Sequence, residues 1–153
     1  MKNITPFLWF DGNAEEAADY YVSVFPNSKI RNVVHGSGPM GPVTIVAFSL
    51  GGTEFSALDG GPEFTFSSAV SFVVECETQA EIDRYWEKLA AGGEEQACGW
   101  LKDKFGLTWQ VVSRGIDKLL YGTDPEGSQR AMQAMLKMKK LDLAALKKAY
   151  AGN

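Results

Sequence analysis

An internal repeat is the feature that most constrains how this chain can fold. Residues 4–10 are an apolar stretch with strand character, and a helix is predicted to begin at Asn13, with Glu16 three residues later. A shift of 65 residues reproduces this pattern, because an apolar run at residues 70–75 precedes Thr78, with Glu81 three residues later. Asn or Thr at a helix start can accept a hydrogen bond from a backbone N–H, and the Glu can reach back to another. The sequence therefore predicts a strand–helix unit that occurs twice.

The segments that follow each predicted helix extend the two units. Strand patterns at residues 29–34, 43–50 and 53–59 follow the first helix, and a Gly/Pro-rich segment at residues 35–42, which contains His35, is predicted to be a mobile loop. The second unit continues with strand patterns near residues 96–102 and 107–113, but its fourth strand is not identifiable. We therefore predict an α+β fold of two βαβββ modules, at about residues 4–59 and 69–113 of one domain spanning residues 1–153.

The C-terminal segment, residues 117–152, is predicted to be a helical tail. Asp124-Pro125 and Asp142 are typical helix starts, and methionine and leucine residues supply an apolar face. Between residues 130 and 148, Asp142 is the only acidic residue. The same stretch contains six basic residues: Arg130, Lys137, Lys139, Lys140, Lys147 and Lys148. A solvated helix face is the simplest interpretation, and a surface for an interaction partner is the alternative.

Composition excludes several classes of protein. The net charge of −4 argues against nucleic acid as a partner, and no apolar run is long enough to span a membrane. Met1-Lys2-Asn3 leads directly into the first strand, so we expect no secretory signal. The two cysteines, Cys76 and Cys98, form no metal-binding or disulfide motif. We therefore predict a cytoplasmic protein.

Three stretches and the tail carry a resemblance to a known family: residues 5–18, 20–30 and 98–110, together with residues 132–145. In them the chain resembles the PhnB-like group of the vicinal oxygen chelate superfamily, which includes glyoxalase I, bleomycin-resistance proteins and extradiol dioxygenases. Members of the group are often named 3-demethylubiquinone-9 3-methyltransferase. The resemblance implies paired βαβββ modules that form a curved mixed sheet with a concave ligand site, and a homodimer.

The resemblance also implies where a metal would bind. Enzymes of the superfamily hold a divalent metal with His and Glu or Gln side chains, and the corresponding positions lie near Pro6, Ser56, Ser71 and Gln110. Of these four residues only Gln110 can act as a ligand, so we predict no metal site and no cofactor. A methyltransferase would need a Gly-rich loop between a strand and a helix. The pairs Gly51-Gly52 and Gly60-Gly61 both lie at ends of predicted strands, and no helix is predicted directly after either pair.

A concave ligand pocket is nevertheless expected. By the 65-residue correspondence, Phe7 and Trp9 should pack under the helices with Phe72 and Val74, so that side chains of the opposite parity line the pocket. The predicted pocket residues are Leu8, Ser56, Ser71, Cys98, Trp100 and Gln110. Cys98 is expected beside Trp100 on one strand face. It is the best candidate nucleophile, although no histidine is close in sequence to activate it and a small buried thiol is the simpler interpretation.

Three functions remain open from the sequence. The first is a metal-free protein that binds a small apolar or partly polar molecule. The second is an enzyme of the lyase, isomerase or dioxygenase type that uses Gln110 or Cys98 in the same pocket. The third is an interaction protein that acts through its tail. Whether the chain is an enzyme is not decided by these residues.

Overall fold

The computed structural model describes residues 3–153. The chain divides into two compact units, Met1–Phe66 and Ser67–Asn153. We call them module 1 and module 2 and describe each by itself. Met1 and Lys2, on which the expectation of no secretory signal partly rests, lie outside the described residues.

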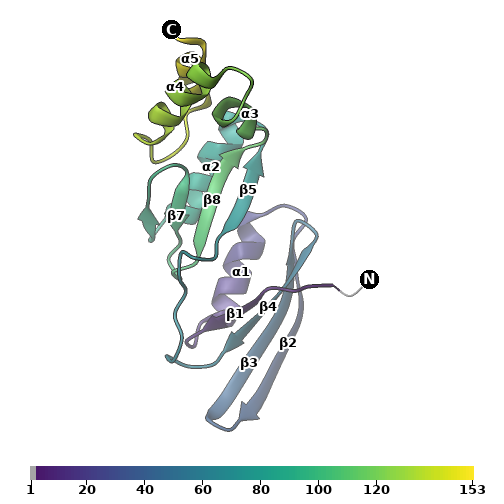
Figure 1. Ribbon diagram of the computed structural model, residues 1–153. Coiled ribbons are helices and arrows are strands. Elements are labelled where there is room, and N and C mark those ends of the chain that lie inside the picture. Colours follow the sequence, from purple (N-terminus) through teal and green to yellow (C-terminus); the bar gives the residue numbers. More distant parts are fainter. Residues whose placement is uncertain (1–2) are drawn as a thin grey trace. The chain divides into compact units, whose positions relative to one another are not determined.

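Module 1 is a four-stranded sheet with one helix. Its elements are β1 (Phe7–Phe10), α1 (Ala14–Val24), β2 (Lys29–Gly38), β3 (Gly41–Leu50) and β4 (Thr53–Asp59). The strand order is β1-β4-β3-β2, with β1 parallel to β4 and the other pairs antiparallel (Figure 1). The core forms where α1 meets the sheet, because the Tyr21 ring stacks on Phe48 with centroids 6.4 Å apart, and Phe48 stacks on Phe55 at 5.4 Å.

Module 2 repeats this topology. Its elements are β5 (Phe72–Cys76), α2 (Gln79–Ala90), β6 (Glu94–Glu95), β7 (Trp100–Lys102) and β8 (Thr108–Ser113), in the order β5-β8-β7-β6 with β5 parallel to β8. Each strand corresponds in order and direction to one of module 1, which confirms the predicted α+β fold of two βαβββ modules. The apolar stripe of α2, whose side chains recur at i, i+3, i+4 and i+7, is buried: Ile82, Tyr85, Trp86 and Leu89. The two-residue β6 is the strand that the sequence did not reveal.

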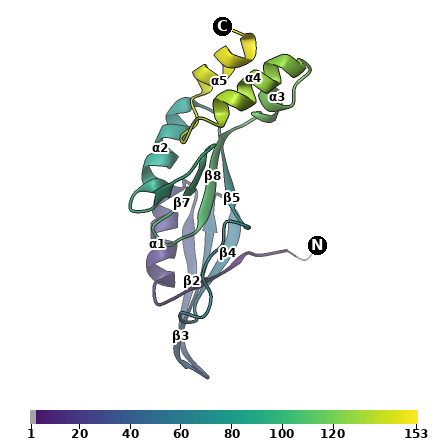
Figure 2. The same ribbon diagram turned by 60° about the vertical axis from the view of Figure 1, so that its left-hand side comes forward.

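Three helices follow β8 in module 2, as predicted for the tail (Figure 2). They are α3 (Asp117–Leu120), α4 (Pro125–Met135) and α5 (Leu143–Ala151). The side chain of Asp142 accepts a hydrogen bond from the backbone N–H of Ala145 at 3.0 Å, so it caps α5 as expected. None of the helices in residues 3–153 has the length and apolar character that crossing a membrane requires.

The Gly/Pro-rich segment at residues 35–42 is not the predicted loop. Strands β2 and β3 continue through it as a hairpin, and His35 lies in β2 opposite Thr44. Pro39 and Met40 form the turn between the strands, where a proline needs no ladder hydrogen bond. The prediction was wrong because exposed strands tolerate glycine when the paired backbone supplies the hydrogen bonds.

A one-residue difference between the modules changes which side chains face the helix. Three residues, 11–13, connect β1 to α1, whereas two residues, 77–78, connect β5 to α2. The helices therefore keep the 65-residue offset, but the ends of the strands are 66 residues apart, from Phe10 to Cys76. Side chains alternate along a strand, so a shift of one residue exchanges the two faces.

The predicted face was consequently wrong in module 1 and right in module 2. Leu8 is 6% exposed and pairs with the buried Ala57, whereas Phe7, on the opposite face, is 58% exposed. In module 2, Phe72 and Val74 pair with Trp109 and Val111, which are buried on the α2 side.

Candidate functional site

The candidate site is the sheet face of module 2 that points away from α2, which we call the open face of module 2. Trp100 on β7 and Gln110 on β8 are direct cross-strand partners, and Val73 on β5 flanks Gln110 from the other side. Val73 is 54% exposed, while Trp100 and Gln110 are half-buried. Ser71 lies just before β5. The structure thus brings together three of the predicted pocket residues: Ser71, Trp100 and Gln110.

Two side-chain hydrogen bonds join β8 to the segment that precedes β5. The Nε2 of Gln110 donates to the Oγ of Ser71 at 2.9 Å. Two residues earlier on β8, the buried hydroxyl of Thr108 lies 3.0 Å from the Oγ of Ser68. Ser68 is a site residue that the sequence pattern does not predict, because its contact depends on the path of residues 67–71 beside β8.

The Ser71–Gln110 pair is uncharged and keeps hydrogen-bonding capacity. A serine hydroxyl that accepts one hydrogen bond can still donate its hydrogen, and a glutamine amide that donates one N–H keeps a second N–H and its carbonyl oxygen. The neighbouring Trp100 and Val73 add apolar surface. Apolar walls with a few polar groups that fix orientation are typical of small-ligand sites.

The two predicted pocket residues in module 1 do not share a face. Ser56 pairs with Phe7 and Ala47, which places it on the face away from α1. Leu8 pairs with Ala57 and is buried on the α1 side. The assignment of Leu8 to the pocket was therefore wrong, for the reason of connection length given above.

Cys98 was predicted to lie beside Trp100 on one strand face, and this prediction was wrong. It is in the connection between β6 and β7, with a left-handed backbone at φ 62°. Its backbone N–H donates to the carbonyl oxygen of Met138 at 2.9 Å, so the tail holds this connection. Strand alternation consequently gives Cys98 no place on the open face of module 2.

The residues at the superfamily's metal positions do not fit a divalent cation. Ser71 and Gln110 are hydrogen-bonded to each other, Ser56 offers only a hydroxyl, and Pro6 has no ligand atom in its side chain. Within residues 3–153, no three His, Cys, Asp or Glu side chains come together in a group that could hold a metal ion. Divalent cations prefer carboxylate or imidazole ligands, and neither is present at these four positions.

Two acidic residues that could have acted as bases have structural partners instead. The Oδ1 of Asp59 accepts a hydrogen bond from the backbone N–H of Ala14 at 2.8 Å, at the start of α1. Asp103 is buried, and its carboxylate accepts hydrogen bonds from the N–H groups of Phe105 and Leu107 and from the Nε1 of Trp109. Both carboxylates stabilise backbone turns or helix ends.

The diglycines do not form a cofactor loop. Gly51-Gly52 joins β3 to β4, and Gly60-Gly61 follows β4, with no helix before α2. An adenosyl cofactor site would need a Gly-rich connection from a strand into a helix.

Comparisons with known proteins identify relatives of the chain. The family model described as 3-demethylubiquinone-9 3-methyltransferase matches residues 2–112. The PhnB protein from Bacillus cereus is 35% identical, with a TM-score of 0.67 over 74% of this chain and 100% of that chain. No curated protein matches.

More distant solved structures share the fold. Protein PA1353 from Pseudomonas aeruginosa is 21% identical, with a TM-score of 0.65 over 74% of this chain and 98% of that chain. A mutant of the fosfomycin resistance protein FosX from Listeria monocytogenes, complexed with Mn(II) and 1S,2S-dihydroxypropylphosphonic acid, is 14% identical, with a TM-score of 0.53 over 72% of this chain and 91% of that chain. The two-module topology is therefore the glyoxalase/bleomycin resistance fold, and the chain belongs to the 3-demethylubiquinone-9 3-methyltransferase, or PhnB-like, family.

Proposed function

We propose that this protein binds a small, largely apolar and uncharged molecule on the open face of module 2 without the help of a metal. The observation that carries the proposal is the hydrogen bond between Gln110 and Ser71 beside Trp100. A paired amide and hydroxyl offer both donors and an acceptor but no charge, which suits a carboxamide, carbonyl or hydroxyl group better than an anion. The indole of Trp100 suits a flat apolar body.

The donor set distinguishes this chain from its metal-bound neighbour. The FosX mutant was complexed with Mn(II) and a phosphonic acid, which is an anionic ligand. Ser71 and Gln110 have no charge with which to hold either partner, so we expect the binding preference of this chain to be for neutral ligands.

The test is calorimetric titration with two ligands of equal size. 2-Naphthamide is apolar with a neutral amide, and 2-naphthoate replaces the amide with a carboxylate. We expect the amide to bind at least about tenfold more tightly in buffer that contains EDTA, because Ser71 and Gln110 give a carboxylate no cationic partner in exchange for its lost hydration. Equal binding of the two ligands, or tighter binding of 2-naphthoate, would contradict the proposal.

A matched pair of variants locates the binding site. Gln110→Leu removes the amide and keeps side-chain volume, so it should weaken the binding of 2-naphthamide by about tenfold, as expected for a lost hydrogen bond. Ser56→Ala lies in module 1 and should leave the titration unchanged if the ligand contacts module 2 alone. Unaltered affinity in Gln110→Leu would remove this face from the proposal.

We also propose a homodimer in the cytoplasm. Edge strands with exposed apolar side chains favour pairing with another chain, and module 1 exposes Phe7 on β1 and Val34 on β2. Both cysteines are free thiols, as is usual in a reducing compartment.

A further inference from the structure

The segment that connects α4 to α5 is bound to two separate parts of module 2. Its carbonyl oxygens at Met138 and Lys139 accept hydrogen bonds from the backbone N–H groups of Cys98 and Gly99, at 2.9 and 2.8 Å. We call residues 138–143 the strap. The family model ends at residue 112, so the strap lies beyond the part of the chain that the model matches.

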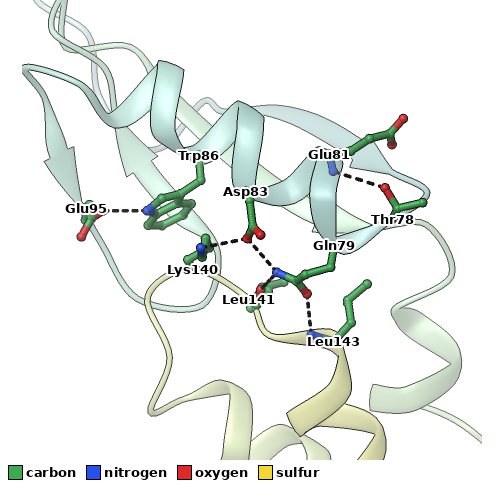
Figure 3. A network of polar contacts seen from close by, with 9 residues as sticks. All are labelled: Thr78, Gln79, Glu81, Asp83, Trp86, Glu95, Lys140, Leu141 and Leu143. Atoms are coloured by element: carbon green, nitrogen blue, oxygen red, sulfur yellow. Dashed lines mark hydrogen bonds and ion pairs between the residues drawn. The ribbon is translucent and has the colours of Figure 1, made fainter.

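The strap is also bound to the N-terminal half of α2, through Gln79 and Asp83 (Figure 3). The side-chain amide of Gln79 donates to the carbonyl oxygen of Leu141 and accepts from the backbone N–H of Leu143, each at 2.9 Å. Lys140 forms an ion pair with Asp83, with Nζ and Oδ1 2.8 Å apart. The side chain of Gln79 therefore forms hydrogen bonds with the strap backbone at two positions.

Packing at Gly99 makes the contact specific. Gly99 is buried with a left-handed backbone, and a Cβ at this position would lie 3.1 Å from the Cγ of Leu141, which is itself fully buried. The carbonyl oxygen of Gly99 accepts from the backbone N–H of Val111 on β8. A direct chain of contacts thus runs from the strap through Gly99 to β8.

This chain of contacts ends at the candidate site. Trp100 follows Gly99 directly and pairs with Gln110, which is adjacent to Val111 on β8. The residues before Trp100 have left-handed backbones at Cys98 and Gly99, a conformation that is costly for Cys98 and persists where surrounding contacts hold it.

We propose that the strap positions Trp100, with Gln79 as the positioning residue that keeps the strap in place. The carbonyl oxygens of Met138 and Lys139 hold the Cys98–Gly99 turn, and the turn sets the position from which the indole reaches the open face of module 2. The consequence for ligand affinity rests on the proposed function, whereas the ordering of the turn does not.

The test measures amide hydrogen exchange by NMR in the full chain. Gln79→Ala removes both hydrogen bonds to the strap, so exchange at the Cys98 and Gly99 amides should accelerate by about tenfold while the amides of β3 remain protected. Leu141→Ala, which removes the contact with Gly99, should have the same local effect. The control is Arg130→Ala, which loses bonds to Ala149 and Tyr150 but none to the strap, and should leave these two amides unchanged.

A second readout separates positioning from general support. In protein labelled with fluorotryptophan, the Trp100 signal, assigned with Trp100→Phe, should shift or broaden in Gln79→Ala, and 2-naphthamide should bind more weakly. Unchanged exchange at Cys98 and Gly99 in both strap variants would overturn the proposal. If exchange at Cys98 and Gly99 is faster in the strap variants but the wild-type protein does not bind 2-naphthamide, the result would support the role of the strap in ordering the turn. It would then contradict only the proposed binding function.

Discussion

Asp103 shows how one residue can hold a turn together. Its buried carboxylate accepts hydrogen bonds from the backbone N–H groups of Phe105 and Leu107, in the β7–β8 connection, and from the indole N–H of Trp109. In Asp103→Asn, an NH₂ group would replace one carboxylate oxygen and would face an N–H donor instead of accepting a hydrogen bond from it. This substitution should therefore lower the free energy of unfolding by about 2–4 kcal/mol. Trp109→Phe, which removes one of these hydrogen bonds and introduces no donor, should cost about half as much. Urea unfolding measures both, and a near-neutral Asp103→Asn would show that the carboxylate is not structural.

The two cysteines should differ in reactivity. Burial, and secondarily the nearby carboxylate of Glu81, raises the pKa of the Cys76 thiol from 9.0 to about 11. Because the thiolate is the reactive form, iodoacetamide at pH 8 should modify Cys98 and leave Cys76 unmodified in the folded protein. Mass spectrometry of the digested protein shows which cysteine carries the modification. Urea-unfolded protein is the control, in which both thiols should react.

The same shift in the pKa of Cys76 has a consequence for stability. In the unfolded chain the thiol loses its proton near pH 9.0, whereas in the folded protein it keeps its proton to about pH 11. Stability contributed by the protonated thiol is therefore complete below pH 9 and declines as the pH rises toward 11. Cys76→Ala should lack this part of the decline in urea midpoints measured between pH 8 and 11.

At the scale of elements, the two equivalent helices begin with different caps. Thr78 accepts from the N–H of Glu81 at 3.2 Å, and Glu81 reaches back to the N–H of Glu77, much as the sequence pattern predicted. Asn13 makes no such side-chain bond, and Asp59 from β4 binds the N–H of Ala14 instead. A cap supplied from another strand is invisible in a local pattern.

This difference gives a prediction with an internal control. Thr78→Ala and Asp59→Ala should each lower the free energy of unfolding by about 1 kcal/mol, as expected for a lost helix cap. Asn13→Ala should change it by less than about 0.5 kcal/mol, because no capping bond is lost. Urea unfolding of the three variants checks the assignment, which a large effect of Asn13→Ala would contradict.

The elements also show what sequence reasoning can and cannot reach. The α2 stripe and the Thr78 cap were predictable because both depend on residues within about two helix turns of each other. The face reversal in module 1 was missed because the connection at residues 11–13 is one residue longer than its counterpart at residues 77–78, and a single 65-residue offset hides this difference. The position of Cys98 was missed for a related reason, since β6 and β7 are too short to show alternation.

At the scale of the whole molecule, the duplicated topology was predictable because a strand followed directly by a helix occurs again about 65 residues later in the chain. The Ser71–Gln110 hydrogen bond depends on the register between β5 and β8, which are separated by a helix and two strands in the sequence. Long-range register of this kind decides which polar groups meet on a face.

Assembly is tested on the intact chain. If the protein is a homodimer, size-exclusion chromatography with light scattering should give about twice the 16.7 kDa of one chain at tens of micromolar. Charges in the exposed apolar edges should oppose pairing, so Phe7→Glu with Val34→Glu should shift the mass toward that of a monomer. A wild-type mass of one chain would contradict the proposed dimer.

The account depends most on the claim that Ser71 and Gln110, at two of the positions where the family resemblance would place a metal, form a neutral hydrogen-bonding pair instead. Titration of ¹⁵N-labelled protein with Mn(II) tests this most directly, because a bound Mn(II) ion broadens the NMR signals of nearby nuclei. We predict that the side-chain amide signal of Gln110 and the backbone signal of Ser71 broaden no more than those of other exposed residues. Selective loss of these two signals at stoichiometric Mn(II) would contradict the account.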